Sequence, residues 1–306
     1  MHPYLPTGAL AIDLALGGGL PAAGISEISG PSGSGKTTLL LNLAAQAQQL
    51  GHSVAWIDAG GDLEPAYAVR CGIDPGNLYV ASTPNPVLVI DLLENLARSG
   101  AFGLVILDSL DPLLPGDAAP AGETGRISLA LRRLCEAGLQ TALAIARGGI
   151  PERGPLYHGL AQEPQRLALK LHAAVRLRLQ TDGEITINRC NAGCHVHAKV
   201  LKDLRPAKDL PCRGTPGFDI MYGLGIVSAG EAFTLGLQLG LITWHPAGAY
   251  VYQGAALGAG QSECLERLRR KPGLCAALEQ AIRRKLFHQL DPAVESVSAG
   301  PSAATV

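Results

Sequence analysis

The chain has 306 residues, 47% of them hydrophobic, and a formal net charge of −1 at pH 7. That is enough for one large core, or for a core with a small appendage. No stretch reaches the roughly 18 uncharged apolar residues that a membrane helix needs, and the N-terminus lacks the basic-then-apolar pattern of a secretory signal. We therefore expect a globular cytoplasmic protein with no membrane partner, in which any binding of nucleic acid depends on a local basic patch.

Short apolar runs alternate with amphipathic stretches through the first half of the chain. The runs predict buried strands at residues 25–29, 53–58, 78–81, 104–108 and 141–146. The stretches between them predict helices at residues 38–50, 86–99 and 126–137. This alternation is typical of an α/β fold with a mostly parallel sheet and helices on its faces.

The pattern changes after Lys170. Residues 173–179, 184–188 and 197–202 predict strands that extend the sheet in antiparallel fashion. Beyond them, two short strands (241–245 and 249–253) and two helices (261–270 and 272–286) predict a small α+β subdomain. We expect a core over residues 1–240, this C-terminal subdomain over 241–289, and a disordered tail over 290–306.

A phosphate-binding pattern, the P-loop, lies at residues 30–37 between the first predicted strand and the first predicted helix. It fits G-x-x-x-x-G-K-[ST], and the predicted ATP-binding residues here are Gly30, Pro31, Ser32, Gly33, Ser34, Gly35, Lys36, Thr37 and Thr38. Backbone N–H groups and the helix N-terminus attract phosphate, Lys36 neutralises the β- and γ-phosphates, and Thr37 binds Mg²⁺. The alternative is a chance glycine-rich turn, but the strand and helix around the pattern favour an ATP site.

The strand at residues 104–108 ends in a carboxylate, Asp108. In a P-loop protein an apolar strand of this kind places its acid beside the magnesium ion, so we predict Asp108 as the second Mg²⁺ residue and, with Lys36, as part of the catalytic site. Taken alone, a strand that ends in Asp usually begins a turn.

Several blocks of sequence, in order along the chain, resemble the RecA family of recombinases. The blocks are Pro6-Thr7-Gly8, Asp13-Leu14, residues 15–21, Glu27-Ile28, Ile57-Asp58-Ala59, Pro65, Tyr67-Ala68, residues 97–100, Asp108-Ser109, residues 168–170, Val175-Arg176-Leu177, Lys199-Val200, Lys202, Gly223 and Gly225-Ile226. The resemblance spans roughly residues 6–288 and implies a RecA-type core acting in homologous recombination, DNA repair and the SOS response to DNA damage.

The resemblance also implies roles for individual residues. Tyr67 would stack on the adenine, and Glu64, where the family has an aspartate, would accept a hydrogen bond from the adenine amino group. Lys202 would reach the nucleotide of a neighbouring subunit in a filament. Without the resemblance, Tyr67 reads equally well as helix packing and Lys202 as a solvated strand residue.

In such proteins two loops hold single-stranded DNA. Residues 116–125 and 148–164 match these loops and are rich in glycine and proline. Arg126, Arg147 and Arg153 are the candidates for contacts with DNA phosphates. An ordinary surface loop has the same composition, and neither loop is densely basic.

The chain departs from the family at residues that bear on catalysis. The family has a catalytic glutamate just after the 53–58 strand, where this chain has Gly60-Gly61. Asp62 and Glu64 are the candidate replacements, but a general base must come within about 3 Å of its water, so ATP hydrolysis is in doubt. At the end of the 141–146 strand the family has a γ-phosphate-sensing glutamine, where this chain has Arg147-Gly148-Gly149, which implies an altered switch between ATP and DNA.

Residues that assemble the family's filament also differ. The first matching block begins six residues from Met1, whereas the family carries an N-terminal polymerisation arm ahead of it. Either the chain starts late in its reading frame, or it needs a RecA-family partner subunit to assemble. A second interface lysine corresponds to Leu204, beside Arg205. Together these departures indicate a diverged paralogue.

Cysteine and histidine side chains permit one further hypothesis. The seven cysteines are odd in number and scattered, which favours reduced thiols. Cys190, Cys194, His195 and His197 lie close together and are ligand types that suit zinc, but their spacing matches no standard zinc pattern. An ordinary polar hairpin is the alternative.

Three functions fit these patterns. The first is a RecA-like protein of recombination and repair, which binds ATP, Mg²⁺ and single-stranded DNA, self-associates, and acts as a DNA-dependent ATPase. The second is a non-hydrolysing ATP-binding accessory factor that partners a recombinase or a repair polymerase. The third is a RecA-fold ATPase that acts on something other than DNA, which fits the core but not the block-by-block match.

Overall fold

The computed structural model describes residues 3–113, 129–134, 136, 139–148, 169–187, 189–204, 215–246 and 248–287. The chain forms two compact units, Met1–Val227 and Ser228–Val306. The boundary predicted from the sequence lies after residue 240. Helix α8 (Ala229–Gln238) therefore belongs to the second unit and not to the predicted core.

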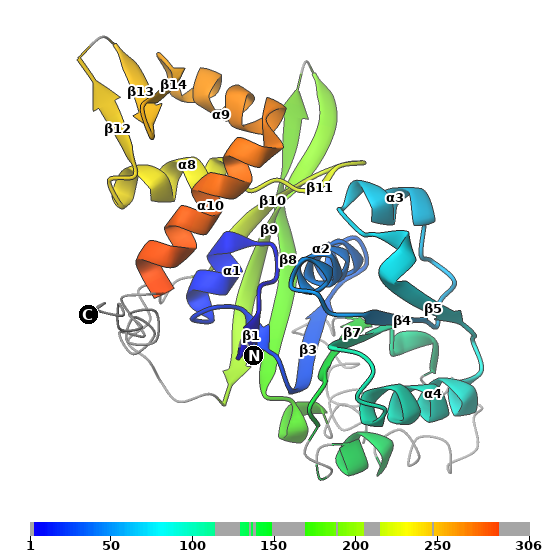
Figure 1. Ribbon diagram of the computed structural model, residues 1–306. Coiled ribbons are helices and arrows are strands. Elements are labelled where there is room, and N and C mark those ends of the chain that lie inside the picture. The colour runs from blue at the N-terminus through cyan, green and yellow to red at the C-terminus, as the bar shows by residue number, and fades with distance from the viewer. Residues whose placement is uncertain are drawn as a thin grey trace, which may run out of the picture. The chain divides into compact units, whose positions relative to one another are not determined.

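The first unit contains the predicted alternation of strands and helices (Figure 1). Its elements are β1 (Tyr4–Leu5), α1 (Leu10–Ala15), β2 (Leu20–Pro21), β3 (Gly24–Gly30), α2 (Lys36–Gln49), β4 (Val54–Asp58), α3 (Pro65–Arg70), β5 (Leu78–Ser82), α4 (Pro86–Arg98), β6 (Leu104–Asp108), β7 (Ala142–Gly148), β8 (Val175–Ile187), β9 (Cys190–Asp203), β10 (Gly217–Met221) and β11 (Gly225–Ile226). Short 3₁₀ turns cover Pro75–Asn77 and Asp111–Leu113.

The described strands of this unit form a nine-stranded sheet in the order β11-β10-β9-β8-β3-β7-β6-β4-β5, apart from the short β1–β2 pair. The strands from β8 to β5 run parallel, and β9, β10 and β11 continue the sheet in antiparallel fashion. The predicted α/β fold, with a mostly parallel sheet extended by antiparallel strands, is therefore confirmed.

The two faces of the sheet bury different helices, because successive side chains of a strand point to opposite faces. Ile28 and Ile106 belong to a core cluster that contains the apolar residues of α2. Ile25, Val105 and Leu107 belong to a second cluster, which contains the apolar residues of α4. The sheet is thus buried on both sides, as continuous apolar strands predict.

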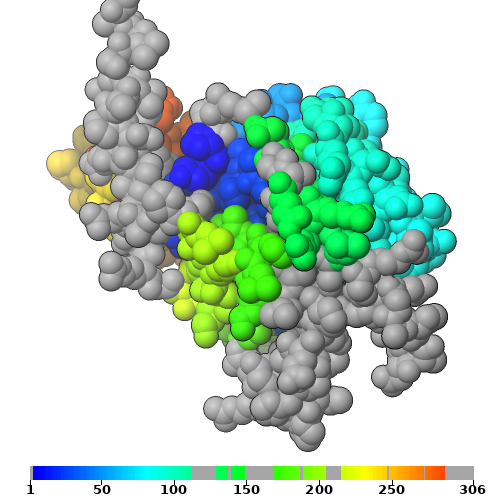
Figure 2. Space-filling view, turned by 90° about the horizontal axis from the view of Figure 1, so that it is seen from below, coloured from blue at the N-terminus to red at the C-terminus, as the bar shows by residue number. Residues whose placement is uncertain are grey.

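Helical residues 129–134 and 136 cover part of the second face, within the helix predicted at 126–137. Leu131 and Leu134 are buried in the same cluster as Val89 and Leu93 of α4. In Figure 2, green atoms from the middle of the chain lie beside cyan atoms from the segment before it.

Parallel strands bring the carboxyl ends of β3, β7, β6 and β4 to one edge of the sheet. The register pairs Gly30 at the end of β3 with Gly148 of β7, and Asp58 of β4 with Asp108 of β6. In open α/β sheets ligands bind at this edge.

The second unit contains α8, a three-stranded antiparallel sheet and two further helices. These are β12 (Ile242–His245), β13 (Ala249–Tyr252), β14 (Ala255–Gly258), α9 (Gln261–Arg270) and α10 (Pro272–Phe287). Strand β14 and helix α8 were not predicted, because glycine and alanine dilute their apolar pattern. The predicted tail at 290–306 lies outside the described residues. None of the described helices is long and apolar enough to cross a membrane.

Candidate nucleotide-binding site

The P-loop joins β3 to α2, and two of its glycines are required by the local geometry. Gly35, directly before α2, has a φ of 85°, and a Cβ there would lie 2.4 Å from the side chain of Ile220. A Cβ at Gly30 would lie 2.6 Å from the carbonyl oxygen of Leu179. The first turn of α2 has neither an acidic residue nor a side-chain cap, so its N–H groups remain available to an anion.

Lys36 lies at the start of α2, and its ammonium group folds back over the loop. Nζ donates to the carbonyl oxygens of Gly30 and Pro31, both at 2.9 Å. Burial lowers the pKa of Lys36, and the carboxylates of Asp111 and Asp108 oppose that shift. The position suits a cation that neutralises bound phosphates.

Thr37 and Asp108, the two residues predicted to hold Mg²⁺, are in direct contact. Thr37 Oγ1 donates to Asp108 Oδ2 at 2.8 Å. Burial raises the pKa of Asp108, and the nearby carboxylates of Asp58 and Asp62 raise it further. A hydroxyl and a carboxylate are the hard oxygen ligands that Mg²⁺ prefers, and the crowded negative charge favours a bound cation, so these residues fit the ion.

Thr38 connects α2 to the predicted adenine side of the site. Its Oγ1 lies 2.9 Å from the hydroxyl of Tyr67 on α3, and burial raises the pKa of that tyrosine to about 12. The guanidinium of Arg70 lies 5.8 Å from the Tyr67 ring centroid and 3.6 Å from Glu64. Thr38, Tyr67, Glu64 and Arg70 thus lie on one side of the cleft, and the roles of Tyr67 and Glu64 toward adenine stay predictions.

The segment after β4 is organised by the buried carboxylate of Asp58. Asp58 accepts hydrogen bonds from the N–H groups of Gly61, Asp62 and Leu63. Gly60 offers no side chain to the site, while Asp62 and Glu64 are both exposed. The position of the expected glutamate is therefore taken by a backbone turn.

These groups line one cleft of about 620 Å³, a volume within the usual range for a ligand pocket. Its wall contains the P-loop residues Lys36 and Thr37 as well as Tyr67 and Asp108. Residues that the sequence analysis did not assign to the site also line it: Arg70, Ser109, Asp111, Cys194, Ile220 and Tyr222. Two of them carried a signal in the sequence: Ser109 belongs to the Asp108-Ser109 block of the family pattern, and Tyr222 directly precedes one of its glycines.

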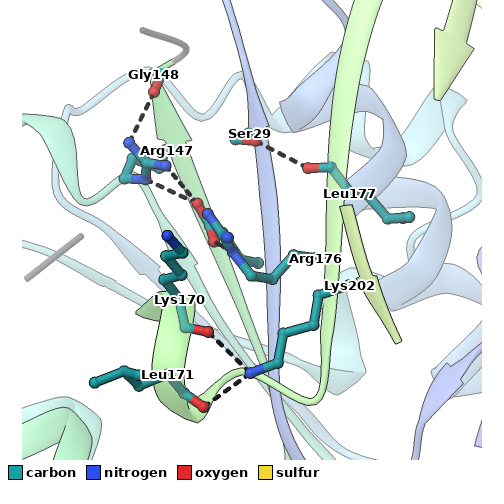
Figure 3. Close-up of polar contacts among 9 residues, drawn as sticks. Ser29, Arg147, Gly148, Lys170, Leu171, Arg176, Leu177 and Lys202 are labelled. Carbon is teal, nitrogen blue, oxygen red and sulfur yellow. Dashed lines mark hydrogen bonds and ion pairs between the residues drawn. The ribbon is translucent and has the colours of Figure 1, made fainter. Parts of the chain in front are cut away.

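Arg147 lies inside the first unit, whereas the sequence analysis assigned it to DNA phosphates. Its Nε and Nη2 donate to Glu27 Oε1 at 2.9 and 2.6 Å, and only 4% of the residue is exposed. Arg176 Nε donates to the other oxygen of Glu27. Burial alone would raise the pKa of Glu27, but the guanidinium groups of Arg176 and Arg147 lower it. Figure 3 shows both guanidinium groups converging on this carboxylate, so Arg147 presents no charge to a DNA strand.

Lys202, predicted to reach the nucleotide of a neighbouring subunit, donates to the carbonyl oxygens of Lys170 and Leu171 at 2.9 and 2.8 Å (Figure 3). Leu204 nearby is 64% exposed. The inter-subunit role of Lys202 stays a prediction.

The predicted DNA-contacting residues Arg126 and Arg153 lie outside the described residues. The same holds for the 116–125 loop and for all of the 148–164 loop except Gly148.

The candidate zinc residues do not come together. Cys190 and Cys194 both belong to β9. His195 Nδ1 lies 2.6 Å from Asp219, and His197 Nε2 lies 2.6 Å from Asp182. Within the part of the chain that the structure describes, no group of three or more metal-ligating side chains is found.

Comparison with known proteins identifies the family. Residues 3–227 match the model of the RecA N-terminal domain. Protein RecA of Caulobacter vibrioides is 34% identical, over 91% of this chain and 80% of the relative. Protein RecA of Streptomyces ambofaciens is 34% identical over 98% and 83%, and that of Heliobacterium modesticaldum is 35% identical over 91% and 82%. The chain belongs to the RecA family.

Proposed function

We propose that this chain binds ATP with Mg²⁺ in the cleft and binds single-stranded DNA in an ATP-dependent assembly, acting in homologous recombination and DNA repair. The observation that carries the proposal is the contact of Thr37 with Asp108 beside Lys36, at the mouth of the P-loop. This arrangement suits a magnesium nucleotide better than a simple anion, because it pairs phosphate donors with hard oxygen ligands for the metal. Membership of the RecA family favours DNA as the partner. It also favours an assembly in which the chain associates with further copies of itself or with another RecA-family subunit.

The test is the affinity for a fluorescent single-stranded oligonucleotide with ATP, with ADP and without nucleotide, across a series of salt concentrations. We expect ATP to tighten binding and salt to weaken it, because phosphate contacts release counterions. Lys36→Ala should lose the ATP effect while it keeps any nucleotide-independent binding. Equal affinity in all three nucleotide conditions would refute the ATP-dependent assembly.

A second function rests on Gly60. Because no side chain occupies the place of the expected glutamate, the chain also fits a non-hydrolysing accessory factor that uses ATP as a structural ligand for binding a recombinase or a repair polymerase. ATP turnover with and without single-stranded DNA separates the two. Stimulated turnover supports a DNA-dependent ATPase, and ATP binding without any turnover supports the accessory factor.

A further inference from the structure

The cleft contains a carboxylate that the proposed function leaves without a role. Asp111 begins the 3₁₀ turn that follows β6, at the edge of the sheet where β6 and β7 end. It lines the same cleft as Lys36, Thr37 and Asp108. Burial lowers the pKa of Lys36, and the carboxylate of Asp111 opposes that shift more than the carboxylate of Asp108 does.

Two donors hold this carboxylate in a fixed orientation. The backbone N–H of Gly148 donates to Asp111 Oδ2 at 2.6 Å, and Ser109 Oγ donates to the same oxygen at 3.3 Å. Among the described residues, no hydrogen bond is made to Asp111 Oδ1. Within the described residues, one oxygen is therefore anchored, and the other has no hydrogen-bond donor.

Gly148 makes room for this arrangement. A Cβ at position 148 would lie 2.9 Å from Asp111 Oδ1 and 3.1 Å from Oδ2, closer than carbon and oxygen tolerate. Any side chain there would push the carboxylate from its place. Asp111 and Gly148, far apart in the sequence, thus form one structural unit at the edge of the sheet.

The other carboxylates of the cleft are less suited to proton transfer. Asp108 is bonded to Thr37, and Glu64 lies 3.6 Å from Arg70. Asp62 is exposed and lies in the turn that Asp58 holds. Asp111 is partly buried, oriented, and not bonded to a cationic side chain among the described residues.

We propose that Asp111 is the general base of ATP hydrolysis in this chain and takes the place of the glutamate absent at position 60. The inference rests on the proposed ATP-binding function. As a water oxygen forms its bond with the γ-phosphorus, one water proton passes to Asp111 Oδ1. The bond between the γ-phosphorus and the β,γ-bridging oxygen breaks, and its electron pair leaves with ADP. Lys36 neutralises the departing phosphate charge, and Asp111 returns its proton to solvent.

The experiment measures ATP affinity and the rate of phosphate release for the full chain and its Asp111→Asn variant. Asparagine keeps the size of the side chain, and its oxygen still accepts the Gly148 N–H, but it cannot take a proton. We expect ATP affinity within a few-fold of wild type and a kcat at least about 100-fold lower. Asp91→Asn, the same change on the exposed face of α4, is the matched control and should leave kcat unchanged.

A second variant separates catalysis from a structural role. Asp111→Ala removes the base and opens space beside Gly148, so added sodium formate should restore part of kcat, whereas sodium chloride at equal concentration should not. An unchanged kcat in Asp111→Asn would overturn the inference. So would a wild-type chain that binds ATP tightly but releases no phosphate, with or without DNA. Loss of ATP binding in the wild type would instead overturn the proposed function itself.

Discussion

Replacing Glu27 by glutamine tests the buried ion cluster that Glu27 forms with Arg147 and Arg176. The side chain of Glu27 is fully buried, and those of Arg147 and Arg176 are 5% and 14% exposed. The cluster therefore contains two guanidinium groups and one carboxylate away from water. Glu27→Gln keeps the shape but leaves two buried positive charges without a counter-charge. Removing one partner of a buried ion pair costs about 3–5 kcal/mol.

The loss of folding stability in Glu27→Gln should be visible in thermal unfolding. In a domain of this size each kcal/mol shifts Tm by about 2–4 °C, so Glu27→Gln should lower Tm by roughly 10 °C. Glu136→Gln makes the same chemical change in an exposed ion pair with Arg132 and should leave Tm unchanged, because solvent screens that pair. A Glu27→Gln variant as stable as Glu136→Gln would refute the reasoning.

The difference in stability between the wild type and Glu27→Gln should change with pH in a defined direction. The folded-state pKa of Glu27 lies below the ordinary glutamate value of 4.5. A carboxylate whose pKa is lower in the folded state than in the unfolded state stabilises the fold at pH values above its unfolded-state pKa. This stabilisation is lost as the pH falls through its folded-state pKa. The stability advantage of the wild type over Glu27→Gln should therefore be constant from neutral pH to about pH 5 and shrink below it. An advantage that grows on acidification would contradict this assignment.

Three further variants test the cleft. Tyr67→Ala should weaken ATP binding about 5- to 150-fold, because stacking of a base on an aromatic ring is worth roughly 1–3 kcal/mol, whereas Tyr67→Phe, which keeps the ring, should change it little. An unchanged dissociation constant for Tyr67→Ala would remove this residue from the adenine site. Thr37→Ala should abolish most of the gain in ATP affinity that Mg²⁺ provides, and a full Mg²⁺ effect in this variant would place the metal elsewhere. Gly60→Glu should raise ATP turnover, because it returns a carboxylate to the cleft, and the gain should be clearest in an Asp111→Asn background. Equal phosphate release with and without Gly60→Glu would show that position 60 does not face the attacking water.

The sequence could predict the parts of the site that depend on local spacing. Lys36 and Thr37 follow from the P-loop pattern, and Asp108 follows from an apolar strand that ends in an acid. The same periodicity predicted the parallel strands, because each is a continuous apolar run buried on both faces.

Residues whose roles depend on distant partners could not be predicted. The side chain of Arg147 points inward because Glu27, 120 positions earlier, and Arg176 meet it across neighbouring strands. The turn that contains Asp111 reads as an ordinary loop until β7 places the Gly148 N–H beside it. In both cases the parallel sheet joins segments whose distance in the sequence gives no sign of contact.

Calorimetric titration of the chain with ATP and Mg²⁺, beside the Lys36→Ala variant, tests the central claim most directly. The nucleotide site predicts one ATP bound per chain in the wild type. It also predicts loss of that binding in Lys36→Ala, with the thermal unfolding of the variant unchanged. Unchanged ATP affinity in a folded Lys36→Ala variant would contradict the assignment of the cleft as the ATP site.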